Sequence, residues 1–428
     1  MKIAIVGKNG FGGREHTIAD TIHRQNPRTE LFLFPGNGGT VELGENLAAD
    51  SITSIVDECK RREIDLLIGG PEADLDEGLA DLSRSKGITT FGPSQAGARL
   101  ESEKLFTKEV MEIFKVPTAS YQFFPYSEIS QIPSFLNERG FPAVIKANGL
   151  AAGKGVLVLK GEEGDFAAAE KFVADLGSGA YGGSGRSGVL VEKFLAGEEA
   201  SLFYLVNSNN DILIPMSSAR DHKRAYDGDR GPNTGGMGAF SENPLLDDQR
   251  VTEITQTIAR PVVEGLKRLG IPYIGVLYVG LMLEDEKSSV VEINCRFGDP
   301  EIQVLAPRLK SNLQETLCAV AMGENPGPLE WISNQCVGVV LASDGYPGSY
   351  ERGKLISGLK SLPEELCLFH AGTRRMGEDV YTSGGRVLNL VGTGTDLQQA
   401  RKKVYDFLDS EKLYFEGMMY RSDIAKGI

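Results

Sequence analysis

Glu292 and Asn294 occupy alternate positions at the end of a short apolar segment. Alternate residues of a β-strand point to the same side, so we expect a carboxylate and an amide oxygen to meet at one point. Such hard oxygen ligands suit Mg²⁺ or Mn²⁺, which also take phosphate oxygens and water. A single Glu-x-Asn pair is more often an exposed strand face, so this metal site is a hypothesis that depends on the rest of the chain. Arg296 follows in a dense turn, where its guanidinium is well placed for an anion.

A glycine-rich segment follows the buried strand expected at Ala143–Lys146, and its composition suits phosphate binding. Small residues let the backbone approach phosphate oxygens, and lysines offer cations. The residues concerned are Lys146, Gly149, Gly153, Lys154 and Gly155. The segment is not a Walker A loop, because its lysine lacks the preceding GxxxxG and the following Ser or Thr. Lys104, in a separate segment, offers a further cation for phosphate.

A second segment suits the base and sugar of a nucleotide. The backbone of the strand end Glu192, Lys193, Phe194 and Leu195 can hydrogen-bond an adenine edge. Glu199, shortly after, can accept hydrogen bonds from ribose hydroxyls. Each of these features is weak alone, but their order and spacing together favour an ATP site.

The run Arg220–Phe240 (RDHKRAYDGDRGPNTGGMGAF) alternates in charge and ends in glycines. A stretch so polar cannot bury apolar surface, so we expect a loop outside the core that contacts a ligand. Its acidic residues Asp221, Asp227 and Asp229 can recognise an ammonium group or help hold a metal. Its basic residues Arg220, Lys223 and Arg224 can bind a carboxylate or phosphate. His222 suits either proton transfer or a structural hydrogen bond. A solvated surface loop is the alternative interpretation of the whole run.

The first glycine loop, GKNGFGGRE, lies between a strand and a helix but does not match GxGxxG. The second strand also lacks the acid that a dinucleotide ribose requires, so NAD binding is disfavoured. Gly12 and Gly13, with Arg14, instead favour a phosphate-bearing substrate at the start of a helix. Glycines needed only for tight packing are the alternative.

The bulk composition excludes several classes of protein. The net charge of −14 argues against a general nucleic-acid binder, which needs a basic surface. No apolar stretch is long enough to span a bilayer, and the N-terminus has no signal-peptide pattern. Five scattered cysteines fit reduced thiols better than disulfides or a zinc site. We therefore expect a cytoplasmic protein with no membrane partner.

Hydrophobic patterning gives the elements that must position these residues. Short apolar strands at 2–6, 30–34, 65–68 and 88–91 alternate with helices such as 15–23 and 76–86, which predicts an α/β parallel sheet. Further strands are expected at 143–146, 155–159, 189–194, 201–206, 211–215, 274–283, 289–293, 337–343 and 387–391. Further helices are expected at 102–114, 165–175, 251–269, 313–322 and 397–408.

Several segments resemble the phosphoribosylamine–glycine ligases, ATP-grasp enzymes of purine synthesis. The matching segments are GGREH (12–16), GPEA (70–73), FGPS (91–94), KANGLAAGKGV (146–156), DHKRAYDGDRGPNTGGMGAF (221–240), EINCRFGDPE (292–301) and SGGRVL (383–388). They span the chain in order. The segments at 221–240 and 292–301 are highly specific to that family. Asn148 departs from the Asp common in that family, and Asp74 from its more usual Pro.

The resemblance implies an ATP-grasp fold, α/β with α+β parts. A Rossmann-like preATP-grasp domain would cover residues 1–102, and the central ATP-grasp domain 103–122 and 191–325. An ATP-lid domain would be inserted at 123–190, with a C-terminal domain at 326–428. We expect a monomer.

The implied reaction joins glycine to 5-phospho-β-D-ribosylamine with ATP, through a glycyl phosphate, giving N1-(5-phospho-β-D-ribosyl)glycinamide, ADP and phosphate. This is the second step of de novo purine (IMP) biosynthesis. Lys104, Lys146 and a Mg²⁺ or Mn²⁺ ion on Glu292 and Asn294 would neutralise the phosphates. The catalytic residues would be Lys146, Asp221 and Arg296. The residues that contact the substrates would be Gly12, Gly13, Arg14, Asp221, Lys223, Arg224, Asn233, Thr234, Gly235, Gly236, Met237, Gly238 and Arg296.

Two other readings remain. A formate-dependent or carboxylating ATP-grasp ligase would share the ATP residues but is disfavoured by the run 221–238, which is read as specific to the glycine ligases. A non-catalytic nucleotide-binding protein is disfavoured by the intact Lys104, Lys146, Glu192, Glu292 and Asn294.

Overall fold

The N-terminal hundred residues form the predicted parallel sheet with helices on its faces. The computed structural model describes residues 1–151, 155–179 and 187–428. In the order β3-β2-β1-β4-β5, the strands are Glu45–Asn46, Glu30–Phe34, Lys2–Val6, Leu66–Gly69 and Thr89–Phe91. The helices are α1 (Gly13–Gln25), α2 (Ile52–Arg61), α3 (Glu72–Asp76), α4 (Leu79–Ser85) and α5 (Gln95–Ser102). The helix expected at 76–86 is present as α4 but begins three residues later, because Gly78, at φ +87°, separates it from α3.

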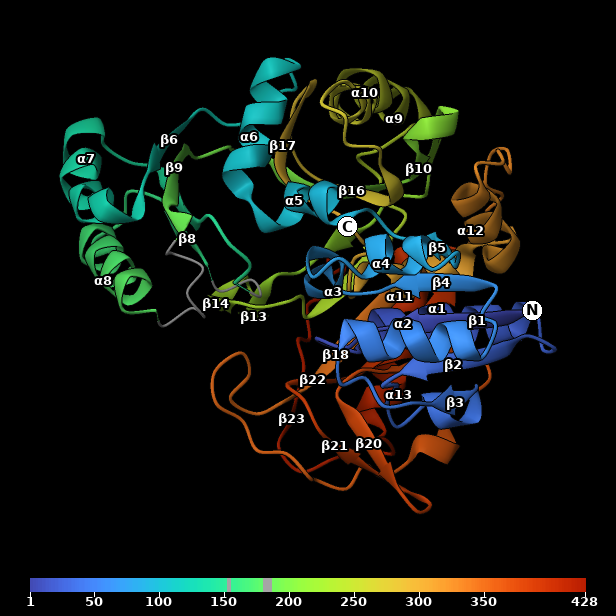
Figure 1. Ribbon diagram of the computed structural model, residues 1–428. Helices are drawn as coiled ribbons and strands as arrows, with labels where there is room; N and C mark the ends of the chain where they lie inside the picture. Colours follow the sequence, from blue (N-terminus) through green and yellow to red (C-terminus); the bar gives the residue numbers. More distant parts are fainter. Residues whose placement is uncertain (152–154, 180–186) are drawn as a thin grey trace.

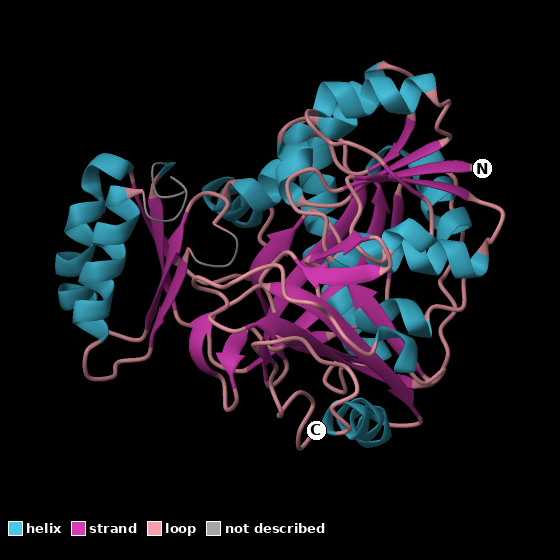
Figure 2. Cartoon of the chain, turned by 90° about the horizontal axis from the view of Figure 1, so that it is seen from below, coloured by secondary structure: helices cyan, strands magenta, loops and turns pink. Residues whose placement is uncertain are grey.

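A small antiparallel sheet stands apart from the rest of the chain (Figure 1). Its order β6-β9-β7-β8 joins Tyr121–Phe124, Val189–Lys193, Ala143–Ala147 and Val156–Leu159. Helices α7 (Ile132–Arg139) and α8 (Asp165–Ser178) cover the side that faces away from the molecule, as Figure 2 shows. Apolar residues of both helices and the sheet form a core of their own. The segment predicted as a lid therefore lies within a separately packed unit, whose bounds remain a prediction.

The central sheet is buried on both faces. Its order β11-β10-β16-β17 joins Ile212–Pro215, Glu198–Asn207, Ile274–Glu284 and Lys287–Asn294 in antiparallel pairs. In β10, Leu202 and Tyr204 pack in a core with α6 (Lys104–Ile113), α9 (Asp248–Ile254) and α10 (Arg260–Arg268). Phe203 and Leu205 point the other way, toward α11 (Glu301–Leu305) and α12 (Leu313–Met322). The helix predicted at 251–269 is divided by a π-helical turn at Thr255–Ala259.

The C-terminal sheet takes strands from far apart in the chain. Its order β12-β15-β18-β22-β19 joins Arg220–Asp221, Gly238–Ser241, Gln335–Ser343, Arg386–Gly394 and Leu366–His370, and β23 (Met418–Met419) also pairs with β18. Helix α13 (Leu397–Asp409) packs on this sheet, and β20 (Thr373–Met376) and β21 (Asp379–Thr382) form a hairpin. Within the described residues, no helix has the length and apolar character to cross a bilayer.

The run Arg220–Phe240 is not the loop that its composition predicts. It begins as β12, continues as a hairpin of β13 (Arg224–Tyr226) and β14 (Arg230–Asn233), and ends as β15. Met237 and Phe240 are fully buried, which corrects the expectation that the run stays outside the core. The reason is pairing of β15 with β18, a strand about a hundred residues later.

Candidate active site

The ammonium group of Lys146 lies in a buried cluster that contains the carboxylate of Glu192. It lies on β7, where its Nζ is 3.0 Å from Glu192 Oε2 and donates to the Val291 carbonyl at 2.9 Å. Val291 is the extra residue of a bulge in β17 against β16. The Glu192 side chain is only 4% exposed, and Lys108 of α6 is the second cation beside it, at 3.2 Å. The structure thus brings together Lys146 and Glu192, two residues of the predicted ATP site, and adds Lys108.

Lys104 lies at the first residue of α6, one turn before Lys108. Its Nζ donates to the Gly149 carbonyl at 3.1 Å, and burial, together with the charge of Lys146, lowers its pKa. Asn148 fastens the same loop, because its Oδ1 accepts from the Leu105 N–H and its Nδ2 donates to the Ser187 carbonyl. An aspartate could accept the first of these bonds but could not donate the second. The amide at 148 therefore has a structural reason.

The other residues predicted to bind the nucleotide lie at the end of β9 and before β8. The Lys193 N–H donates to the Ser120 carbonyl, so it does not serve an adenine. Phe194 and Leu195 follow the strand, are half-buried, and lie beyond its pairing. Gly155 pairs through its carbonyl with the Ala147 N–H. Gly153 and Lys154 fall outside the residues that the structure describes.

Lys223 joins the predicted nucleotide, metal and substrate residues. Its Nζ is 3.1 Å from Glu292 Oε1 and 3.3 Å from Glu199 Oε2. The charge of Lys223 lowers the pKa of Glu292 to about 2, and Lys146 acts in the same direction. Burial raises this pKa, but its effect is smaller than that of Lys223. Asn294 lies two residues after Glu292 on β17, opposite Tyr278 of β16. Glu292 and Asn294 thus offer an ionised carboxylate and an amide oxygen from one strand, and no set of three possible His, Cys, Asp or Glu ligands occurs in the described ranges.

Asp221 lies beside this group. Burial raises the pKa of its carboxyl well above the ordinary value, and the charges of Glu301 and Glu199 act in the same direction, while Lys223 opposes them. The neighbouring His222 is half-buried, and desolvation of its ring lowers its pKa to about 4. His222 is thus neutral near pH 7 and poorly suited to donate a proton.

Arg296 is held between two acids that the sequence analysis did not assign. Its guanidinium is 2.7 Å from Glu101 Oε1 and 3.1 Å from Glu72 Oε2. Burial raises the pKa of Glu101 to about 7, although Arg296 opposes the shift. Glu101 also accepts from the Cys295 N–H at 2.8 Å. The Arg296 side chain is 18% exposed, and each of its three guanidinium nitrogens already has a partner in Glu72, Glu101 or the Phe297 carbonyl.

The start of α1 is already occupied by carboxylates. The Gly12 N–H donates to Glu15 Oε2 at 2.7 Å, and the Arg14 N–H to Asp299 Oδ2 at 3.3 Å. The Arg14 side chain is buried and bonds Glu15 and the Phe297 carbonyl. A Cβ at Gly13 would lie 2.4 Å from the Gln303 amide. A phosphate at Gly12 and Gly13 would therefore have to displace Glu15, and its binding there remains a prediction.

The later part of the run is fixed by close contacts. Thr234 is buried and bonds the Lys223 carbonyl through both its N–H and hydroxyl, and Gly236 donates to its Oγ1. Gly236 has φ +108°, and a Cβ there would lie 2.4 Å from Pro300. The Met237 N–H donates to the His222 carbonyl. The other assigned residues are Arg224, which bonds Gly231 within the hairpin, Asn233, paired with Arg224, Gly235, bonded to Tyr346 and Arg386, and Gly238, paired with Val339.

Lys108, Glu72, Glu101 and Arg386 are among the polar residues that the sequence did not assign to this site, as are Glu15 and Asp299 at the start of α1. A signal existed for Lys108, since positions i and i+4 share one face of a helix and Lys104 was already assigned. Arg386 lies in the segment SGGRVL, which was recognised without a role. Glu72 likewise lies in the segment GPEA, which was recognised without a role, whereas Glu101 carried no local pattern.

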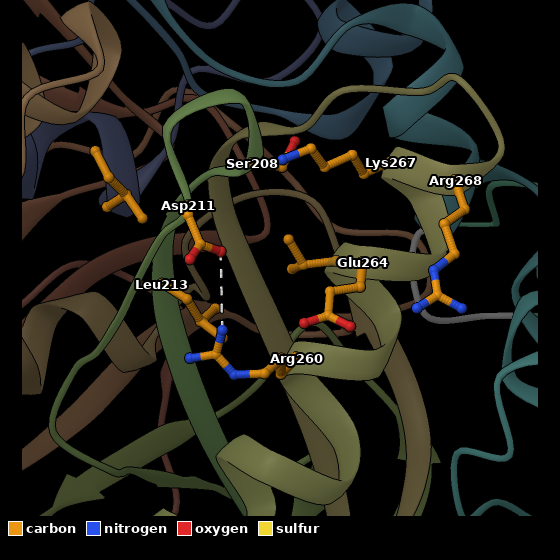
Figure 3. A pocket seen from close by; sticks show the side chains of 9 residues that line it. Ser208, Asp211, Leu213, Arg260, Glu264, Lys267 and Arg268 are labelled. Atoms are coloured by element: carbon orange, nitrogen blue, oxygen red, sulfur yellow. Dashed lines mark ion pairs between the residues drawn. The ribbon is translucent and has the colours of Figure 1, made fainter.

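A separate pocket lies between α10 and the segment from Ser208 to Leu213, which leads into β11 (Figure 3). It measures about 520 Å³, and its lining includes Asp211, Arg260, Glu264, Lys267 and Arg268. Arg260 and Asp211 are 3.8 Å apart across it. None of the predicted site residues lines this pocket.

Three family models match consecutive parts of the chain. They are the N domain, the ATP-grasp (A) domain and the C domain of phosphoribosylglycinamide synthetase, at residues 1–101, 102–302 and 336–427. A phosphoribosylamine–glycine ligase from Halalkalibacterium halodurans is 40% identical over 99% of this chain and 96% of its own. One from Allochromatium vinosum is 44% identical over 99% and 98%.

Solved structures agree with these matches. The crystal structure of phosphoribosylamine–glycine ligase from Thermotoga maritima has a TM-score of 0.84 and 33% identity, covering 99% of this chain and all of that one. N5-carboxyaminoimidazole ribonucleotide synthetase from the same organism has a TM-score of 0.64 at 17% identity, covering 97% and 99%. A biotin carboxylase domain from Hydrogenobacter thermophilus, in complex with MgADP and bicarbonate, reaches 0.70 at 17%, covering 98% and 91%. These last two likenesses concern the fold alone.

Proposed function

The chain belongs to the phosphoribosylamine–glycine ligase family of ATP-grasp enzymes, and from this membership we propose how its side chains divide the reaction. The activity is the ATP-dependent ligation of glycine to phosphoribosylamine in purine biosynthesis. The observation that carries the proposal is Lys223, which contacts Glu199 and Glu292 at once. Through it, the run 220–240 meets the residues assigned to ATP.

The proposed ATP site is formed by Lys104, Lys146 and the segment from Glu192 to Glu199. Lys104 and Lys146 neutralise the phosphates, and Phe194 and Leu195 offer backbone groups to the base. Glu199, 42% exposed, can accept hydrogen bonds from the ribose. A biotin carboxylase domain of the same fold is in complex with MgADP, which supports a nucleotide ligand for a chain of this fold.

Glu292 and Asn294 fit a Mg²⁺ or Mn²⁺ ion, because one is an ionised carboxylate and the other an amide oxygen on the same strand. When bound, such an ion would neutralise phosphate charge. Lys223 holds Glu292 in place and would shift toward Glu199 when the carboxylate takes a metal ligand's role.

We propose a two-stage reaction at this site. A carboxylate oxygen of glycine attacks the γ-phosphorus, ADP leaves, and glycyl phosphate forms. The amine of phosphoribosylamine then attacks the acyl carbon, loses a proton, and phosphate leaves with the oxygen that came from glycine. Asp221 holds the glycine ammonium, Arg296 faces the carboxyl group and the phosphate, and the hairpin segment 233–238 shapes the space around them.

Glycine dependence tests the function directly. ADP release is measured with ATP, Mg²⁺ and freshly made phosphoribosylamine, with glycine, formate or bicarbonate as the acid. We expect turnover only with glycine. ADP release that ignores glycine, or that formate or bicarbonate supports better, contradicts the assignment and favours the carboxylating or formate-dependent class.

Isotope transfer tests the intermediate. With glycine labelled by ¹⁸O in its carboxylate, each released phosphate should carry one ¹⁸O, because the C–O bond to phosphorus persists until the acyl carbon is attacked. Unlabelled phosphate would exclude glycyl phosphate while leaving the overall ligation intact.

We also propose that the protein acts as a cytoplasmic monomer. All five cysteines are free, three of them buried, which suits a reducing compartment. Sedimentation at assay concentration tests the monomer, and a species of twice the 46.3 kDa chain mass contradicts it.

A further inference from the structure

Lys108 is a buried cation whose hydrogen bonds are all made within the protein. Its residue is 4% exposed, and its Nζ donates to Thr118 Oγ1 at 2.8 Å and to the Ala119 carbonyl at 3.1 Å. The third neighbour is Glu192 Oε2, at 3.2 Å. An ammonium group has three N–H donors, so Lys108 has none left for a nucleotide.

Lys146 differs in this respect. Glu192 and the Val291 carbonyl account for two of its donors among the described residues, and the third is free to meet a phosphate oxygen. Both lysines share the same oxygen of Glu192. A carboxylate that pairs with two ammonium groups neutralises each only in part, so the cluster keeps a net charge of about +1.

We propose that Lys108 is a positioning residue for ATP, which acts through Glu192 to hold Lys146 in place and to preserve its positive charge for the phosphates. The proposal rests on the ATP site proposed above. Lys108 itself touches no substrate. Without it, Glu192 would pair with Lys146 alone, and the cluster would be neutral toward ATP.

The charge of Lys108 is sensitive to pH in the range of an enzyme assay. Burial and the charge of Lys146 lower its pKa to about 8, against the opposing charge of Glu192. The groups that face it are Glu192 on β9, Lys146 on β7, and the ring of Tyr121 on β6, 5.8 Å from its Nζ and bonded in turn to Glu112. The protonated form holds Glu192, so ATP affinity should fall as the pH rises through about 8.

ATP binding provides a test that does not depend on turnover. The Kd of MgATP is measured by calorimetry on the full chain between about pH 7 and pH 9.5, a range in which the terminal phosphate stays ionised. In the unsubstituted protein, Kd should rise above pH 8. Lys108→Met should raise Kd about tenfold at pH 7 and remove its pH dependence. Lys108→Arg keeps a charge at every pH, so its Kd should stay low and flat.

The controls separate this role from a general loss of structure. Lys115→Met removes an exposed lysine just after the same helix and should leave the Kd profile unchanged. Thermal unfolding of each variant identifies any that fail to fold. If Lys108→Met does not fold, Lys108→Arg still decides, because an alkaline rise in Kd that persists there overturns the proposal.

Two further outcomes are unambiguous. A Lys108→Met protein that binds ATP like the unsubstituted one, or that keeps its pH dependence, also overturns the positioning role. If the unsubstituted protein binds no ATP or turns over without glycine, the proposed function fails instead, so the two failures can be told apart.

Discussion

At the scale of single residues, the site depends on carboxyl groups whose surroundings drive their pKa values apart. Lys223 lowers the pKa of Glu292 to about 2, whereas burial raises those of Asp221 and Glu101. An acid with a lowered pKa beside acids whose pKa values are raised is a pattern typical of functional sites.

Asp221 should make glycine binding depend on pH. Its pKa is raised, and only its ionised form attracts the glycine ammonium, so the KM for glycine should fall as the pH increases through that pKa. Asp221→Asn cannot ionise and should give a KM about ten to a hundred times higher, with no pH dependence, because a charge-assisted hydrogen bond is lost. Steady-state kinetics against pH measures both.

Asp285→Asn is the matched control, since Asp285 is exposed on the turn between β16 and β17. It should reproduce the unsubstituted profile. An Asp221→Asn enzyme whose KM for glycine still falls with pH would show that another group recognises the ammonium.

Glu292 should control metal affinity. Glu292→Gln replaces an ionised donor by a neutral one of the same shape, so Mn²⁺ should bind in the presence of ATP about ten to a hundred times more weakly. Electron paramagnetic resonance of free Mn²⁺ measures this without turnover. Glu286→Gln, on the exposed turn of the same hairpin, should bind Mn²⁺ normally; equal affinity in both variants would remove Glu292 from the metal site.

At this scale, residue types and their order were enough to predict many of the site residues. The partners that these side chains contact could not be predicted from the sequence. Lys146, Glu192 and Glu292 could be chosen because strand ends and glycine loops mark where ligands bind. The sharing of Glu192 with Lys108 depends on how α6 packs against β9, which no local pattern encodes. Glu72 and Glu101 approach Arg296 from about two hundred residues away, so their roles required the fold.

At the scale of elements, long-range pairing decided what local composition could not. The short apolar strands and most helices were predictable because each buries a periodic face. The run 220–240 was not, because Met237 and Phe240 enter a core through the pairing of β15 with β18. Its hairpin β13–β14 buries little and is instead fastened by the C-terminal segment, where Ser422 donates to Asp227 and Asp423 accepts from Gly228.

Arg421 should be the main fastening of that hairpin. It is 1% exposed and bonds Asp229 at 2.7 Å, the Arg224 carbonyl at 3.1 Å, and Asp423. Arg421→Met should lower the free energy of local opening by about 2 to 4 kcal/mol, less than for a fully buried pair because Asp229 is exposed. Amide hydrogen exchange of residues 224–233 should quicken, and the KM for glycine should rise.

Arg230→Met removes an exposed arginine from the same hairpin and should change exchange only slightly. Unchanged protection of residues 224–233 in Arg421→Met would mean that the hairpin is held by its own strand pairing.

At the scale of the whole molecule, Asp299 is the point where three parts of the chain meet. It follows the central sheet, accepts from the Arg14 N–H of α1, and lies 3.4 Å from Arg386 of the C-terminal sheet. Although burial opposes the shift, Arg386 and Arg14 lower the pKa of Asp299, so it stays ionised and keeps both partners. Arg386 also donates to the Gly235 carbonyl at 2.6 Å, and Tyr346 accepts from the Gly235 N–H. Residues of the C-terminal part of the chain thus hold Gly235 of the run 220–240 in place.

Arg386→Met should therefore weaken the binding of glycine and phosphoribosylamine and leave the binding of ATP unchanged. Loss of its bonds to Gly235 and Asp299 frees the segment 235–238, and the KM values for glycine and phosphoribosylamine should rise about ten- to a hundredfold, since hydrogen bonds to charged groups contribute about 1.5–3 kcal/mol. The Kd of MgATP should hardly change, because Lys104, Lys146 and Glu192 make none of these contacts. Arg375→Met tests whether any loosening between domains suffices: Arg375 bonds the Gly38 carbonyl and Glu42 across the N-terminal contact, away from the run. If Arg375→Met raises the substrate KM values equally, the effect belongs to domain docking in general; a rise confined to Arg386→Met assigns the support of the substrate run to this one side chain.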